Sequence, residues 1–293
     1  MSAPAVAVVG ERRMMPRWVR AVGHRLLGVW AAIALLYLFV PIVVIVVFSF
    51  NEPGSVIKGK WKTAAYNYQW GRFSLDAWKH PFKDPGLRDA FVLSLKVALL
   101  AVVISTILGT MMALSLVKYR FTGKGLVNTL LVLPLTMPEV VMGFSLLTLF
   151  VAFNWSRGFV TIVIAHVMFC VSYVATTVKA RIRGFDWRLE EAAQDLGATP
   201  WRTFRKVTLP IIAPGVLAAS LLTFALSLDD FIITLLNAGK EQTFPIKIWN
   251  TKRSSIPPQI NVFGTMILLA SVTLAGIGMF VGRRRERALA AAS

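Results

Sequence analysis

Long apolar runs alternate with short polar segments along the chain. We place the runs at residues 28–50, 90–117, 126–153, 159–179, 211–236 and 262–281. Each holds about 20 or more residues, and a helix rises about 1.5 Å per residue, so each run can cross the roughly 30 Å core of a bilayer. The pattern predicts an all-α, polytopic membrane protein with six transmembrane helices embedded in lipid.

Two prolines, Pro134 and Pro138, interrupt the third run. Proline lacks a backbone N–H and clashes with the preceding turn, so this span is predicted to be kinked or broken. Such breaks are tolerated where protein or a water-filled cavity shields the backbone. The first run is longer than the apolar part of a signal peptide and lacks a small-residue cleavage site, so we expect an uncleaved helix.

The polar segments set the domain organisation and the orientation. We expect a basic tail at 1–27, the first helix at 28–50, an external loop at 51–89, a core of five spans at 90–281 and a second tail at 282–293. Lys and Arg concentrate in the tails and in 118–124 and 179–206, which by the positive-inside rule are cytoplasmic. Both termini are therefore predicted to be cytoplasmic. Because the basic residues flank apolar runs, the net charge of +18 indicates a membrane protein and not a nucleic-acid partner.

Small or polar residues inside the spans predict contacts between helices. Ala101, Ser105, Gly109 and Ala113 follow one another at four-residue spacing, which lets another helix approach closely. His166 has no second His or Cys at ligand spacing, so we expect a hydrogen bond between helices and no metal site.

The segment at 180–210 is too polar for lipid, yet it carries helix signals. Asp186 can cap a helix, Glu190 and Glu191 fall in its first turn, and Gly197 fits the left-handed position that ends it. Thr199-Pro200 can start a second helix. We predict two short helices at an angle, joined at Gly197, with Leu209-Pro210 at the entry to the next span. An amphipathic linker lying on the membrane is the alternative.

The spacing within this segment resembles the signature loop of permease subunits of bacterial ABC importers. The resemblance rests on Glu191-Ala192-Ala193, on Gly197 after a gap of three residues, on Val207 after a gap of nine, and on Leu209-Pro210 after a gap of one. Val207 stands where Ile is usual. The resemblance implies a type I ABC importer permease fold with a cytoplasmic coupling helix that docks on an ATPase subunit. The residues that it implies for docking are Glu190, Glu191, Ala192, Ala193, Leu196, Gly197, Ala198 and Trp201.

Residues 138–147, 165–170 and 227–231 are similar to the spermidine/putrescine branch of that family. The resemblance implies polyamine import across a bacterial inner membrane by alternating access. It also implies three partners, namely a second homologous permease, an ATPase dimer and an extracytoplasmic substrate-binding protein.

Three acids, Glu139, Asp229 and Asp230, lie inside apolar runs, where a carboxylate is costly unless it is paired or wetted. They are candidates to line the route of a polyamine, with Phe144 and Phe231 as aromatic walls for cation–π contacts. The alternative is structural: an Asp pair that caps a broken helix or pairs with a basic residue of another subunit.

The chain is predicted to be a transport subunit without enzymatic activity of its own. Residues 54–60 match most of a phosphate-binding loop, but Trp61 replaces the required Ser or Thr. We therefore expect no bound cofactor, with ATP and Mg²⁺ used by the partner ATPase. Two rival functions remain: an ABC permease for another solute, such as an amino-acid derivative or ferric ion, and a secondary transporter driven by protons through Glu139 and Asp229.

Overall fold

The computed structural model describes residues 17–51, 70, 72–251, 258–269, 271–273 and 276, with side chains from residue 26 onward. These residues are almost entirely helical; the described ranges contain one isolated antiparallel bridge, between Asn51 and Phe73. They form two compact units. One unit is Phe82–Ile256, and the other contains the first two helices and the helix Pro258–Thr273.

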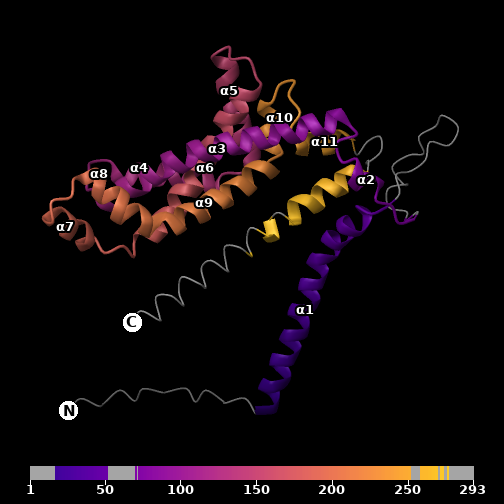
Figure 1. Cartoon of the computed structure of the whole chain (residues 1–293), viewed down its shortest axis with the longest axis horizontal. Helices are drawn as coiled ribbons and strands as arrows, with labels where there is room; N and C mark the ends of the chain where they lie inside the picture. The colour runs from indigo at the N-terminus through magenta and orange to yellow at the C-terminus, as the bar shows by residue number, and fades with distance from the viewer. Residues whose placement is uncertain are drawn as a thin grey trace, which may run out of the picture. The chain divides into compact units, whose positions relative to one another are not determined.

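The larger unit contains ten helical elements (Figure 1). They are α3 (Pro85–Lys118), α4 (Lys124–Thr136), α5 (Glu139–Ala152), α6 (Phe159–Ile182), α7 (Arg188–Asp195), α8 (Pro200–Thr203), the π-helical turn Phe204–Thr208, α9 (Leu209–Asp229), α10 (Ile232–Asn237) and α11 (Phe244–Thr251).

The long helices α3, α6 and α9 lie side by side and pack on one another (Figure 1). Helices α3 and α6 approach closely at Gly109 of α3, where an added Cβ would lie 2.7 Å from the side chain of Val174 in α6. Ala101, Ser105 and Ala113, at the same spacing, are fully buried. The predicted role of this row of small residues in helix packing is therefore confirmed.

Two helices of this unit end inside their apolar runs. The third run is broken between Thr136 and Glu139, and α4 and α5 are bent by 112°. This confirms the effect predicted for Pro134 and Pro138. The fifth run was predicted as one span at 211–236, which is wrong, because α9 ends at Asp229 and α10 starts at Ile232. The backbone of Asp230 is extended there, with φ −61° and ψ 125°.

Four helices among the described residues are long and apolar enough to cross a membrane, or five if the bent pair α4 and α5 is one span. The four are Leu26–Phe48, Pro85–Lys118, Phe159–Ile182 and Pro200–Asp229. The second begins at Pro85, five residues before the predicted start, because Asp84 caps it through Oδ1 to the backbone nitrogens of Gly86 and Leu87. The sixth predicted span, 262–281, lies partly outside the described residues.

The smaller unit contains α1 (Arg17–Phe48), α2 (Asp76–Lys79) and the helix Pro258–Thr273. The ring of Phe50 stacks on Phe73 and on Trp78, with centroids 5.7 and 5.5 Å apart. These contacts bring residues after α1 to α2, so the predicted external loop at 51–89 has local structure. The phosphate-loop match at 54–60 and the tails at 1–16 and 282–293 lie outside the described residues.

Replacing Gly109 with Ala should destabilise the helix bundle, because the new methyl group would overlap Val174. Overpacking of this kind costs about 1–3 kcal/mol. We expect a lower midpoint in a thermal unfolding scan of the purified protein. Gly125→Ala, in α4, is the matched control, since a Cβ there meets nothing within 4 Å. Equal midpoints for the two variants would contradict the close contact.

Candidate functional site

The connection between α6 and α9 is folded as two short helices at a glycine turn. Helix α7 ends at Asp195, and Gly197 follows with a positive φ of 82°, a conformation that glycine adopts without strain. The Thr199 hydroxyl accepts from the Arg202 backbone N–H at 3.4 Å and caps α8. Asp186 accepts from the N–H of Arg188 at 3.1 Å. The predicted pair of helices is confirmed.

The second of these helices was predicted to be short, but it is continuous with the next span. After α8 the chain continues through the π-helical turn Phe204–Thr208 directly into α9. Leu209-Pro210 therefore lies within one continuous helical segment, Pro200–Asp229. Pro210, the first proline of α9, directly follows the π-helical turn, in which each hydrogen bond spans five residues instead of four. This wider turn accommodates the proline.

The outer surface of this loop exposes apolar side chains. Leu196 is 90% exposed and Trp201 is 69% exposed, which is unusual for large apolar groups outside lipid. Glu191, Ala192 and Gly197 are exposed beside them, whereas Ala193 and Ala198 are half-buried. Seven of the eight predicted docking residues thus have accessible surface, on a loop that stands at the end of the bundle (Figure 1).

Glu190 is different from its predicted companions, because it is only 6% exposed and points into the chain. Its Oε2 accepts from the Lys118 ammonium at the end of α3, and its Oε1 accepts from the Thr208 hydroxyl before α9. The Lys118 nitrogen also lies 5.4 Å from the centre of the Trp187 ring, a cation–π contact. Glu190 therefore links the loop by hydrogen bonds to the end of α3 and to the start of α9.

Sequence reasoning missed this link because its two charged partners lie 72 residues apart. The local signal at Glu190 was its place in the first turn of a helix, which the structure confirms but which does not reveal the partner. The only available hint was that a base at the end of the second predicted span and an acid in the 180–210 loop were both predicted to be on the cytoplasmic side.

A second group of polar side chains is buried among α6, α9 and α10. The Nδ1 of His166 lies 2.7 Å from the Ser227 hydroxyl, and its Nε2 lies 2.8 Å from the Thr234 hydroxyl. The Oδ2 of Asp230 accepts from the Thr234 hydroxyl at 2.6 Å and lies 3.5 Å from Nε2. The Thr234 hydrogen is thus used on Asp230, so the Thr234 oxygen accepts from Nε2–H of His166. The predicted interhelical hydrogen bond of His166 is confirmed.

The three acids of the apolar runs are placed in different surroundings. Asp230 also accepts from the backbone N–H of Thr234 at 2.8 Å, so it caps α10, as the structural alternative described. Glu139 is the first residue of α5, Asp229 is the last of α9, and both are exposed on this chain. The two exposed carboxylates stand at helix breaks, where the chain leaves them for water or a partner.

The two aromatic candidates also differ from each other. Phe144 is exposed on α5, and Phe231 is half-buried with its ring centre 5.2 Å from that of Trp249. Neither of the two pockets of the larger unit described below is lined by these rings or by the exposed acids. No group of three or more His, Cys, Asp or Glu that could hold a metal occurs in the part of the chain that is described.

Residues 105–289 match the family described as binding-protein-dependent transport system inner membrane component. The chain belongs to this family. The match covers the coupling loop with Glu190 and Gly197, the polar network and both helix breaks. This permease is therefore a transport subunit of the ABC importer class and a multi-pass protein of the inner membrane. Permeases of this class work with a second permease, an ATPase and a substrate-binding protein.

Curated relatives of the permease are similar over nearly their whole length. It is 33% identical over 251 residues to the spermidine/putrescine transport system permease protein PotC of Haemophilus influenzae, covering 85% of this chain and 93% of the relative. It is 36% identical over 271 residues to the putrescine transport system permease protein PotI of Escherichia coli, covering 88% and 92%.

Solved structures share the fold of the permease at lower identity. A bacterial alginate ABC transporter in complex with its alginate pentasaccharide-bound periplasmic protein matches with a TM-score of 0.62 and 14% identity, over 92% of this chain and 97% of that one. An amino acid ABC transporter matches with a TM-score of 0.54 and 19% identity, over 72% and 100%. These likenesses confirm the predicted type I ABC importer permease fold.

The ion pair between Lys118 and Glu190 should stabilise the permease in a way that depends on both partners. Lys118→Met and Glu190→Gln should each lower the unfolding midpoint. Lys118→Met should have the larger effect, because it leaves the buried Glu190 carboxylate without its charged partner, at a cost on the order of 1–3 kcal/mol. The double variant should lose little more than one single variant. Glu191→Gln, at the exposed neighbour, is the control and should combine additively with Lys118→Met. Additive losses for Lys118 and Glu190 would contradict the link.

Proposed function

We propose that the chain is a permease subunit of an ATP-driven importer of polyamines such as spermidine and putrescine. The observation that carries this proposal is the identity of 33% and 36% to permeases named for these solutes, over most of both chains. The exposed carboxylates of Glu139 and Asp229 support it, because a chain of ammonium groups needs anionic partners at breaks in an otherwise apolar surface.

The proposed assembly is a pair of permeases, an ATPase dimer and an extracytoplasmic substrate-binding protein, with both termini of this chain in the cytoplasm. This chain binds no cofactor and has no nucleotide site, and the ATPase uses ATP and Mg²⁺. The exposed Leu196 and Trp201 enter a cleft of the ATPase, with Glu191, Ala192, Ala193, Gly197 and Ala198 around them. The exposure of these two apolar side chains on a folded turn at the end of the bundle supports this role.

Transport then follows from two mechanical links between the loop and the bundle. Closure of the ATPase dimer displaces α7 and α8 together. The Glu190–Lys118 pair passes the displacement to α3, and the continuous segment from Pro200 to Asp229 passes it to the membrane core. The spans open outward to receive the polyamine from the binding protein and return inward after ATP hydrolysis.

Replacing Asp229 with Asn should lower ATP-dependent uptake of labelled putrescine and spermidine into proteoliposomes holding the whole transporter. We expect a loss of at least about tenfold, because a hydrogen bond to a charged group contributes about 1.5–3 kcal/mol. Basal ATPase activity should not change. Asp89→Asn, an exposed acid in the first turns of α3, is the control. Normal uptake by the Asp229 variant would remove this carboxylate from the pathway.

The same vesicles separate the rival functions. Uptake that continues without ATP and stops with a protonophore would identify a secondary transporter. ATP-dependent uptake of another solute, with polyamines excluded, would keep the ABC class and overturn the substrate.

Replacing Gly197 with Val should uncouple ATP hydrolysis from uptake. The left-handed backbone there costs a residue with a side chain about 1–2 kcal/mol, and a β-branched residue is the least tolerant. No neighbouring atom lies within 4 Å of an added Cβ, so the effect arises from the backbone alone. Gly197→Asn is the matched control, because Asn adopts this conformation more easily. Normal uptake by the Val variant would contradict the docking role of the turn.

A further inference from the structure

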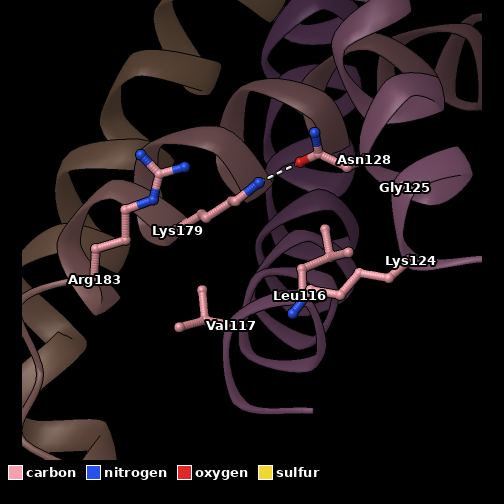
Figure 2. A pocket seen from close by; sticks show the side chains of 7 residues that line it. All are labelled: Leu116, Val117, Lys124, Gly125, Asn128, Lys179 and Arg183. Carbon is pink, nitrogen blue, oxygen red and sulfur yellow. Dashed lines mark hydrogen bonds between the residues drawn. The ribbon is translucent and has the colours of Figure 1, made fainter. Parts of the chain in front are cut away.

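A basic pocket lies where α3 ends, α4 begins and α6 ends. Its volume is about 440 Å³. Three cationic side chains, an amide and two apolar side chains line it, as Figure 2 shows: Lys124, Lys179, Arg183, Asn128, Leu116 and Val117. No acidic side chain contributes to the lining. The three helix ends come from one side of the bundle, the side of the coupling loop.

The described residues do not neutralise the positive charges of this pocket. The Lys179 ammonium donates to Oδ1 of Asn128 (Figure 2). Lys124 donates to the carbonyl oxygen of Tyr119 at 3.0 Å. Arg183 lies one helical turn after Lys179. Within the described ranges none of the three forms an ion pair. Three like charges around one hollow repel each other, and an anion bound between them relieves the repulsion.

A second hollow of about 240 Å³ adjoins the pocket and shares Asn128, Lys179 and Arg183 with it. It lies between α4 and α6, and Leu131, Val132 and Ala175 contribute apolar surface. Leu131 lies about two helical turns beyond Lys124 in α4, and Ala175 lies about one turn before Lys179 in α6, in each case deeper into the span than the cation. The combined site is therefore amphipathic, with a cationic mouth at the membrane boundary and an apolar groove that runs into the membrane.

We propose that this site binds an anionic phospholipid. The phosphate lies among Lys124, Lys179 and Arg183, whose guanidinium can hold two phosphate oxygens at once, and one acyl chain lies along the groove between α4 and α6. Basic pockets between spans at the headgroup level are suited to this chemistry. An acidic side chain of the ATPase would match the charge but would leave the apolar groove empty, so the geometry favours the lipid.

The test uses the full-length permease, purified with its partners and reconstituted in nanodiscs of phosphatidylcholine mixed with phosphatidylglycerol. Lipid that remains bound after extraction is measured by mass spectrometry for the wild type and for three variants. K179Q/R183Q removes two charges. Gly125→Trp blocks the mouth without removing charge, and an added Cβ there meets nothing within 4 Å. Arg181→Gln is the control, because its stem packs against Gly215 of α9 and it does not line the pocket.

We expect phosphatidylglycerol to be retained in preference to phosphatidylcholine. Its retention should fall about 10- to 30-fold in K179Q/R183Q, at about 1 kcal/mol for each charge, and comparably in Gly125→Trp, with no change in Arg181→Gln. Equal retention of the two lipids, or an equal loss in the control, would overturn the proposal.

Two further measurements separate other sources of the anion. Inorganic phosphate that binds as tightly as a short-chain phosphatidylglycerol would make this a site for free phosphate. Loss of the ATPase subunit from K179Q/R183Q, with phosphatidylglycerol still retained, would assign the pocket to an acidic group of that subunit. Either result would overturn the lipid site, whereas weaker phosphate binding and an intact complex would support it.

Discussion

The arrangement of the larger unit depends on the close contact between α3 and α6. Moving an apolar side chain from lipid to a helix interface gains little free energy, because lipid tails are equally apolar. Helices in a membrane therefore associate through tight packing and hydrogen bonds. The small residues around Gly109 allow this packing, and the Ser105 hydroxyl adds a bond to the carbonyl of Val167 at 3.5 Å. Helix α9 then lies against both helices and α4 against α6. The coupling loop connects α6 to α9, so the same contact fixes where the loop stands.

Polar groups inside the spans divide into those that the chain satisfies and those that it leaves open. A network of hydrogen bonds spans the break between α9 and α10. In it, the side chains of His166, Ser227, Thr234 and Asp230 supply one another's donors and acceptors. The amide nitrogen of Asn237 donates to the carbonyl of Gly143 at 3.2 Å and ties α10 to α5. Asp229 and Glu139 stand at the two helix breaks and form no hydrogen bond or ion pair with the described residues. Asp229 and Asp230, adjacent in sequence, therefore differ: the first is exposed and the second is bonded to Thr234.

Features that depend on neighbouring residues could be predicted from the sequence. The turn at Gly197, the cap at Thr199, the break at Pro138 and the stripe at Gly109 all follow from local chemistry or from helical spacing, and the structure confirms them. The family resemblance of the loop followed from fixed spacing in the same way.

Features that depend on tertiary partners could not be predicted from the sequence. The Lys118–Glu190 pair joins distant helices, so the first-turn position of Glu190 gave no reason to separate it from the exposed Glu191. The break after Asp229 is set by the capping of α10 by Asp230, in an apolar run that has no proline there. Sequence reasoning offered capping as one of two roles for this acid, and only the position of Thr234 decides between them.

The continuous helical segment from Pro200 to Asp229 joins the loop to the next span without an intervening coil. Thirty residues of helix are about 45 Å long. If the segment tilts as one body about its middle, a sideways displacement of about 3 Å at Trp201 moves Asp229 by a similar distance in the opposite direction. The π-helical turn Phe204–Thr208 and Pro214 are the places along the segment where it can bend instead, and bending there would shorten the stroke that reaches Asp229.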